Sequence, residues 1–441
     1  MRRTQGLEYR TAVVRVRLSG CDQRKAFQVT HRCGLLYTEL AGHAQWFHDT
    51  YGRDPTQAES LGSVHDLEVL RMHAHSKIGV YTRLMDNITT TRSNRRTGMT
   101  GVRLPYRAKN YMPVTFTRNY GWRVTATGRL ALSLGRADGR ILLPLPDVVD
   151  PRTSEQVSWQ VWGEMELCWD RDNRVWTLHI TYPVTAPPAL NPDKVISVDE
   201  GIINHMTACV ETPQAYEVTV VNGRAARSVK HRRNTAVGSL RQAQSRCVEG
   251  SRRWRELNQA TKRANGKAAR SLRNIDHQVS RKITDMAVRY DTGTIVAGDV
   301  RGIEQNTRQA EKQRVGRHQR RRLSQWSRGR QERYLTEKTG VAIQYQDESW
   351  SSKTCPACST RNRPTGRAYK CSCCGFTCHR DAVGALNILQ RFRHGAYTPI
   401  DVNKPIHVTY LRATPLVPPG TGRVTLSTGP MRPTTSLVLV A

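Results

Sequence analysis

The chain has 441 residues, and its 69 lysine and arginine residues against 36 aspartate and glutamate residues give a formal net charge of +33 and a pI near 10.4. This surplus excludes an ordinary enzyme of small metabolites and indicates a polyanionic partner, most often a nucleic acid. No apolar run reaches the roughly 18 residues of a membrane span, and no apolar segment near Met1 is typical of a secretory signal. The 11 cysteines, several of them isolated, fit a reducing compartment with a metal site better than a disulfide framework.

The first part of the chain combines strand and helix patterns. Thr11–Leu18 alternates β-branched and basic residues, which predicts a half-buried strand. Apolar residues then recur at helical spacing, and after about residue 100 short strand patterns are separated by Gly, Asp and Pro. We interpret residues 1–24 and 100–186 as a small β-barrel or sandwich that a helical insertion, residues 25–99, interrupts.

A proline-rich linker begins the second part of the chain at Pro187. The run Val195–Val198 predicts a buried strand, and residues 223–289 predict long, strongly basic helices. Short strand patterns return at Ile295–Ala297 and Val341–Tyr345. Residues 393–441 are rich in Pro, Thr, Gly and Val without periodicity, and we expect them to form a poorly ordered tail.

Two pairs of cysteines have the spacing of a zinc site. Cys355 and Cys358 form one CxxC pair, Cys371 and Cys374 form the second, and twelve residues separate the pairs. Such pairs place four thiolates tetrahedrally around one zinc ion, and a site closed by four protein ligands is structural rather than catalytic. The alternative is a set of free buried cysteines. We predict a zinc ribbon over residues 355–375.

Two aspartates stand where metal-binding carboxylates are often found. Asp199 ends the buried run Val195–Val198 and is followed by Glu200 and Gly201, whereas Asp381 lies in the first turn of a predicted helix over residues 380–390. Converging carboxylates at such positions would hold divalent metal for phosphodiester chemistry. The alternative is one surface aspartate and one that only complements the helix dipole. These residues alone leave both interpretations open.

Four segments occur in an order that resembles the TnpB family, transposon-encoded relatives of the type V CRISPR effectors. They are Asp199–Ile202, Ile295–Ile303 (IVAGDVRGI), the two CxxC pairs and His379–Ile388 (HRDAVGALNI). The resemblance covers about residues 187–391. It implies an α+β multidomain fold: a wedge-like β-barrel with a helical recognition insertion, then a RuvC-like RNase H fold over residues 187–354 and 376–392 that basic helices and the zinc ribbon split. It also implies a protein of the prokaryotic cytoplasm.

The resemblance assigns Asp199 and Asp381 to the first and third catalytic aspartates of the RuvC-like domain, as ligands of magnesium. The second position departs from the family pattern, because Gly298 stands where the family usually has glutamate. Glu348, at the end of the next predicted strand, is one candidate for the missing acid. Asp299 or Glu304 is another, although the pleat points Asp299 to the face opposite residue 298. The third explanation is an inactive nuclease.

Basic residues are frequent in the predicted helices between Asp199–Ile202 and Ile295–Ile303. They are also frequent in the run Arg314–Arg322. Like charges at this density repel one another unless a polyphosphate lies among them, although a solvated helical face is the alternative. The candidate nucleic-acid-binding residues are Arg232, Arg233, Arg252, Arg253, Arg255, Lys262, Arg263, Arg270, Arg273, Arg320 and Arg321. Tyr106, Tyr111, Tyr120 and Trp122 alternate with basic residues, which suits base stacking or, alternatively, a core.

Together these patterns predict an RNA-guided DNA endonuclease with guide RNA and target DNA as partners. Asp199, Glu348 and Asp381 are its candidate catalytic residues, with two magnesium ions for phosphodiester hydrolysis and one structural zinc. The alternative is an RNA-guided DNA-binding protein of the repressor type that has lost cleavage. A zinc-ribbon RNA-binding protein without a guide would explain the charge and the cysteines but not His379–Ile388.

Overall fold

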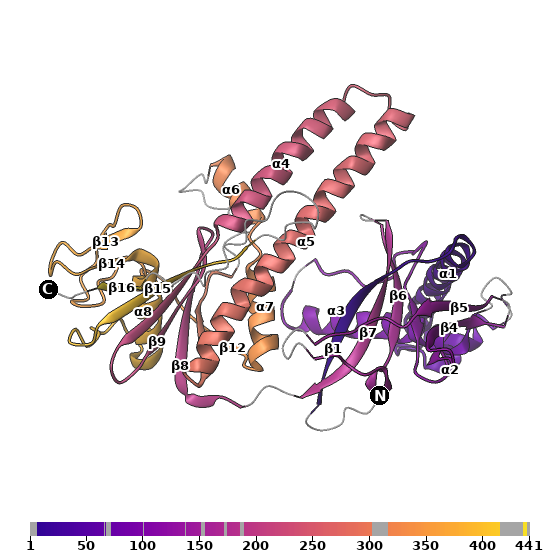
Figure 1. The fold of residues 1–441 in the computed structure, drawn as a ribbon, viewed down its shortest axis with the longest axis horizontal. Helices are drawn as coiled ribbons and strands as arrows, with labels where there is room; N and C mark the ends of the chain where they lie inside the picture. The colour runs from indigo at the N-terminus through magenta and orange to yellow at the C-terminus, as the bar shows by residue number, and fades with distance from the viewer. Residues whose placement is uncertain are drawn as a thin grey trace. The chain divides into compact units, whose positions relative to one another are not determined.

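The computed structural model divides the chain into two compact units, Met1–Ala186 and Pro187–Ala441 (Figure 1). It describes residues 7–65, 67, 72–99, 101–136, 138–150, 155–171, 174–185, 189–301, 316–414 and 435–438. None of the helices in these ranges combines the length and the apolar character that crossing a bilayer requires. Helices and sheets occur in both units, which confirms the mixed α+β class.

The helices of the first unit are α1 (Gly20–Tyr51), α2 (Gln57–Gly62) and α3 (Ala74–Arg96). The hydroxyl of Ser19 caps α1 by accepting a hydrogen bond from the backbone NH of Asp22 at 3.1 Å. The helix ends at Gly52, whose φ of 68° is left-handed. The buried side chains of α1 and α3 recur every three or four residues, so each helix has one apolar face.

The strands of the first unit pair as two sheets. One is antiparallel in the order β1 (Leu7–Val16), β7 (Val175–Thr185), β6 (Met165–Asp170), β2 (Val114–Phe116). The other contains β3 (Trp122–Val124), β4 (Arg129–Gly135) and β5 (Gly139–Pro144), and a short 3-10 helix spans Trp159–Val161. Both sheets and the helices contribute to one apolar core. The expected β-barrel is therefore not a single closed sheet in the described residues.

The second unit is built on a seven-stranded sheet in the order β12-β11-β8-β9-β10-β15-β16. Its strands are β8 (Asn191–Glu200), β9 (Asn204–Glu211), β10 (Tyr216–Asn222), β11 (Thr292–Gly298), β12 (Ile343–Gln346), β15 (Ile406–Arg412) and β16 (Thr435–Val438). The strands β8, β11 and β12 are parallel neighbours, whereas β8, β9 and β10 form an antiparallel meander. The carboxyl ends of β8, β11 and β12 therefore meet at one edge.

The prediction of a poorly ordered tail is wrong for the segment that forms β15. This strand pairs with β10 in parallel, from Ile406 opposite Tyr216 to Arg412 opposite Asn222, and its Ile406 and Val408 are buried. A parallel partner on an existing sheet needs no periodicity beyond one short β-branched run, which prolines on either side obscured. Residues 415–434 and 439–441 lie outside the described residues.

Helices cover both faces of the large sheet (Figure 1). On one face α8 (Arg380–His394) packs on Val195, Val296 and their neighbours. On the other face α5 (Arg252–Arg289) and α7 (Arg328–Thr339) pack on Ile196 and Ala297. Because side chains alternate along a strand, consecutive residues of β8 and β11 contact different helices.

Three further elements complete the second unit. Helix α4 (Arg224–Gln244) packs against α5 as an antiparallel hairpin whose tip extends beyond the sheet (Figure 1). Helix α6 (Arg317–Ser324) precedes α7. Strands β13 (Ala368–Lys370) and β14 (Thr377–His379) form a small antiparallel ribbon that leads directly into α8.

Candidate functional site

One stripe of α8 lies over the carboxyl ends of β8 and β11. A Cβ atom at Gly384 would lie 2.6 Å from Oδ2 of Asp199, so only glycine lets the helix approach this carboxyl group so closely. One residue farther along, the carbonyl of Ala385 accepts a hydrogen bond from the Ser197 hydroxyl at 2.7 Å. Because Asp381 precedes Gly384 by one helical turn, its carboxylate belongs to the same stripe.

Asp381 is held by neighbours on both carboxylate oxygens. The side-chain amide of Asn204 donates to Oδ2 at 2.7 Å, and the Arg367 guanidinium forms an ion pair with Oδ1. The ring of His379, the residue that caps α8, accepts a hydrogen bond from the Asp381 backbone NH at 3.2 Å. These contacts fix the carboxylate at the start of the helix.

Glu348 fills the space that Gly298 leaves. In β11 and β8, Ala297 is opposite Val198, so Gly298 lies beside the end of β8 that carries Asp199. A Cβ atom at Gly298 would lie 2.3 Å from Oε2 of Glu348. The glutamate is half-buried, and β12 delivers it from the next parallel strand, as the sequence predicted for that strand. The Glu348 carboxyl group therefore occupies the space that the Cβ atom of a larger residue at position 298 would need.

The other candidates for the missing acid lie elsewhere. Asp299 is exposed and forms a bidentate ion pair with Arg301, with N–O distances of 2.9 and 2.7 Å. The Arg301 hydrogen bonds lower the pKa of Asp299 to about 2. This position agrees with the pleat argument, which points residue 299 away from the face of residue 298. Glu304 lies outside the described residues.

The carboxyl groups of the site repel one another. Burial, and then the nearby charges of Asp381 and Glu348, raise the pKa of Asp199 well above its usual range, although Arg367 and Arg380 oppose that shift. Burial, together with Asp299 and Asp347, raises the pKa of Glu348 to about 7. A bound cation would remove this repulsion, so the donor set fits a hard divalent metal such as magnesium.

The three carboxyl groups are nevertheless not packed as a single tight cluster. Groups of three or more ligand atoms that lie within 4.8 Å of one another occur twice among the described residues, and neither group includes Asp199, Glu348 or Asp381. Two-metal sites place their ions about 3.5–4 Å apart, and the ligands surround the pair rather than a single point. The three carboxyl groups can therefore surround a metal site without converging on one point.

The four predicted cysteines do form a tight cluster. Their sulfur atoms all lie within 4.8 Å of one another, and Cys355–Cys374 and Cys358–Cys371 are each 3.6 Å apart. Backbone and side-chain NH groups point at the sulfurs, as the Asn362 amide does toward Cys371 at 3.4 Å. Burial opposes ionisation of Cys358, but hydrogen bonds from Thr360 and neighbouring thiols lower its pKa to about 6. This donor set fits zinc.

The cysteine cluster is joined to α8 by a buried asparagine. The side-chain amide of Asn387 donates to the carbonyls of Ser351 at 2.6 Å and Thr354 at 2.8 Å, just before Cys355. Because Asn387 lies on the helix that carries Asp381, the ribbon and the carboxylate stripe share one rigid element. Cys373 is exposed and Cys378 is buried, and both lie outside the cluster.

The predicted nucleic-acid-binding residues lie on three helices of the second unit. Arg232 and Arg233 are on α4, Arg320 and Arg321 are on α6, and α5 carries the rest. The exposed members are Arg232, Arg252, Arg253, Arg255, Arg263, Arg273, Arg320 and Arg321, whereas Arg233, Lys262 and Arg270 are half-buried. The buried Nε of Arg233 and Nη1 of Arg270 have no hydrogen-bond partner within the described parts of the chain. The exposed guanidinium groups are the members of this set that a phosphate can reach.

Two buried acids in this unit escaped sequence reasoning. Asp276 of α5 is fully buried and accepts hydrogen bonds from Ser327, Arg330 and Gln331, which anchors the start of α7. Glu200, next to Asp199, faces α7, where burial and the Glu332 carboxyl group raise its pKa. The sequence does contain a signal for Asp276. This acid lies between Ile275 and Val279, within the apolar stripe of an otherwise basic helix.

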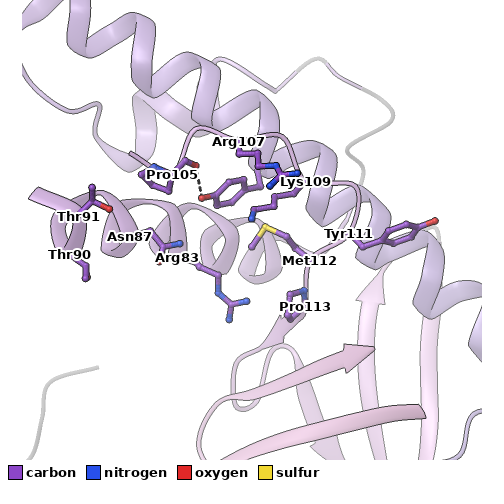
Figure 2. A pocket seen from close by; sticks show the side chains of 11 residues that line it. Arg83, Asn87, Thr90, Thr91, Pro105, Arg107, Lys109, Tyr111, Met112 and Pro113 are labelled. Atoms are coloured by element: carbon purple, nitrogen blue, oxygen red, sulfur yellow. Dashed lines mark hydrogen bonds between the residues drawn. The ribbon is translucent and has the colours of Figure 1, made fainter. Parts of the chain in front are cut away.

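The first unit contains a basic cavity of about 510 Å³. Figure 2 shows Arg83 and Asn87 of α3 on one side and the segment with Arg107, Lys109 and Tyr111 on the other. Tyr37 also lines the cavity and donates a hydrogen bond to the Pro105 carbonyl at 2.9 Å. Cations, an amide and an exposed aromatic ring are the groups that contact phosphates and bases. Tyr120 is also exposed, whereas Trp122 belongs to the core.

Comparison with known proteins agrees with this arrangement. Residues 330–388, which include the cysteine cluster and Asp381, match the family model "Cas12f1-like, TNB domain". A TnpB-like protein of Methanocaldococcus jannaschii is 26% identical over 130 residues, which are 29% of this chain and 45% of the relative. The chain thus spans less than half of that relative's length.

A solved structure of the Cas12f1–sgRNA–target DNA complex shares the fold. It superposes with a TM-score of 0.56 and 11% identity, over 87% of this chain and 99% of Cas12f1. This likeness shows a shared fold, and the cysteine cluster lies within the segment that matches the TNB domain model. The domain match, the TnpB-like relative and the shared fold together confirm the resemblance to the TnpB family that the sequence motifs indicated.

Proposed function

We propose that this protein is an RNA-guided DNA endonuclease in which Glu348 supplies the second carboxylate of a RuvC-like site. The observation that carries the proposal is the position of the Glu348 carboxyl group, 2.3 Å from the point where a Cβ of residue 298 would stand and near Asp199. A chain that had merely lost the acid would have no reason to keep a half-buried, charge-repelled glutamate there, because such a group destabilises the fold.

Asp199, Glu348 and Asp381 would hold magnesium. When bound, the ions supply charge stabilisation for the attacking and leaving oxygens of the scissile phosphate. The chain's own residues do the positioning: Asn204 orients the Asp381 carboxylate, and Gly384 lets α8 approach Asp199. Arg367 and Arg380 lie close enough to lower the pKa of Asp199, so they can also offset phosphate charge.

The basic hairpin of α4 and α5 would bind the RNA partner or its duplex with the target. Base pairing would select the target, and the protein would contact backbone phosphates and a short flanking motif. The cavity between α3 and residues 105–113 is a candidate for one such nucleic-acid contact in the first unit. The four-cysteine cluster would bind a structural zinc ion that stabilises the base of α8.

A cleavage assay tests this proposal. The full-length protein would be purified with its co-expressed RNA and mixed with DNA that carries a matched target beside a randomised flank, with and without magnesium. We expect cleavage of a subset of flanks only when RNA and magnesium are both present. An absence of cleavage under every RNA, flank and metal condition, with guide-dependent DNA binding retained, would contradict the endonuclease.

That outcome would support the second candidate, a guided DNA-binding protein without cleavage. One observation favours it: the Arg367 guanidinium forms an ion pair with Asp381, so a cation of the chain already neutralises one of the proposed metal ligands. The two candidates differ in what happens to that ion pair when magnesium is added. In the endonuclease, Asp381 would hold the metal in place of its ion pair with Arg367, whereas in the binding protein the pair would persist.

A further inference from the structure

A second group of metal-ligand side chains lies in the first unit, on β6 and β7. Glu166 and Cys168 belong to β6, and His179 stands directly opposite Glu166 on β7. One ligand atom from each of the three side chains lies within 4.8 Å of the other two, and all three residues are half-buried. Among the described residues, the ribbon cysteines form the one other group of this kind.

The register of the sheet brings these side chains together. Leu167 and Leu178 are fully buried in the core, so the residues that alternate with them point to the opposite face. Glu166 and Cys168 are two residues apart on that face, and a directly opposed cross-strand pair such as Glu166 and His179 has Cβ atoms about 4.5–5.5 Å apart. The cluster therefore rests on regular β structure rather than on a loop.

We propose that Glu166, Cys168 and His179 form a second zinc site, separate from the ribbon. A thiolate, an imidazole and a carboxylate are the three ligand types that zinc accepts, whereas magnesium and calcium take oxygen ligands. Three protein ligands leave one tetrahedral position open to water or to another ligand. The site would connect β6 to β7 beside α3.

Neighbouring side chains are placed to orient each ligand. Arg83 of α3 forms an ion pair with Oε1 of Glu166, which leaves the second carboxylate oxygen for a metal. The Thr177 hydroxyl donates to the Cys168 carbonyl at 3.4 Å, and it can therefore accept a hydrogen bond from Nε2 of His179 at 3.3 Å. The tautomer of His179 decides which ring nitrogen keeps the lone pair that a metal would need. Hydrogen-bonded partners of this kind usually accompany metal ligands.

The charge balance also permits an ion. Without metal, burial and the Glu166 charge raise the pKa of Cys168 to about 12, so the thiol is neutral. A divalent cation offsets the repulsion between the thiolate and the carboxylate, and binding releases the thiol proton to solvent.

Zinc stoichiometry of the full-length protein tests the proposal. After dialysis against metal-free buffer, elemental analysis should find about two zinc ions per chain: one in the ribbon and one in this cluster. Cys168→Ser and His179→Ala should each lower the content by about one, and the double variant Cys168→Ser/Cys358→Ser should hold almost none. The matched control Cys21→Ser, an exposed cysteine outside both groups, should keep two.

Three results would overturn the second site. They are a wild-type content of one zinc, a content that falls only in Cys358→Ser, or wild-type content in both Cys168→Ser and His179→Ala. The cluster would then be an ion pair between Arg83 and Glu166 with polar neighbours. Cys168 and His179 lie on different strands, β6 and β7. Thermal unfolding curves of both single variants that match the wild-type curve would show that a loss of zinc does not reflect a failure to fold.

Discussion

The cysteine cluster and the carboxylate site both adjoin helix α8, yet the chain encodes them differently. All four cysteines fall within residues 355–374, so their spacing alone defines the cluster. The carboxyl groups come from the ends of β8 and α8 and from the segment after β12, with α5 and the ribbon between them in sequence. A local site is specified by spacing, whereas a site assembled from distant segments depends on the whole sheet. The two should therefore respond differently to single substitutions.

Asp381→Asn is expected to have the largest effect on cleavage. Removing one negative metal ligand should lower the cleavage rate by about three orders of magnitude or more, because the charge acts directly on the transferred phosphate. RNA retention, guide-dependent DNA binding and zinc content should stay at wild-type values. Single-turnover kinetics measure the cleavage rate, and elemental analysis of the same preparation measures the zinc content.

Asp285→Asn, an exposed acid of α5 that pairs with Arg281, is the matched control and should cleave normally. If Asp381→Asn also lost zinc, the carboxylate site and the ribbon would form one structural unit, and the contrast between them would fail.

Unlike Asp381→Asn, Cys358→Ser should change the structure of the ribbon before it changes catalysis. Loss of one thiolate should remove the ribbon zinc, since a closed four-ligand site depends on every ligand. The released loop should become sensitive to limited proteolysis between β12 and α8. The rate of DNA cleavage should then fall, because the Asn387 side chain on α8 would lose its hydrogen-bond acceptors, the carbonyls of Ser351 and Thr354. Cys373→Ser, exposed and outside the cluster, should behave as wild type.

Charge reversal in the basic hairpin of α4 and α5 should weaken RNA binding without changing the cysteine cluster or the carboxylate site. Reversing Arg252, Arg253 and Arg255 to glutamate should weaken RNA retention and reduce the slope of log K against log salt by about two to three units, at roughly 0.7–0.9 per lost phosphate contact. The helix should remain folded, because acidic residues are favourable in its first turn. Filter binding over a salt series measures the slope. An unchanged slope would remove the hairpin from the nucleic-acid interface.

The smallest expected effect is a pH-dependent shift in stability. A carboxyl group whose pKa is about 7 in the fold and about 4.3 when unfolded binds its proton more tightly when folded, so it weakens the fold as pH rises through that window. Without metal, Glu348→Gln should therefore unfold at a higher temperature than wild type above pH 7 and at the same temperature below pH 4. Magnesium should stabilise wild type but not the variant.

Sequence reasoning was sufficient where chemistry is local or where strands are neighbours. The CxxC pairs gave the four clustered cysteines, and the order of the strands predicted Glu348 beside Gly298. Reasoning failed where partners depend on tertiary context. The strand β15 has only a short β-branched run between prolines and is defined by pairing with β10. Asp276 was missed because its partners Ser327, Arg330 and Gln331 lie at the start of another helix, α7.

The most direct test of the central claim compares two acids that stand at the ends of neighbouring strands. Glu348→Gln and Asp299→Asn each replace a carboxylate by an amide of the same shape, and magnesium-dependent single-turnover cleavage is measured for both in the RNA-bound protein. We predict that Glu348→Gln loses cleavage and keeps DNA binding, while Asp299→Asn, whose side chain pairs with Arg301, cleaves at close to the wild-type rate. Normal cleavage by Glu348→Gln would contradict the account.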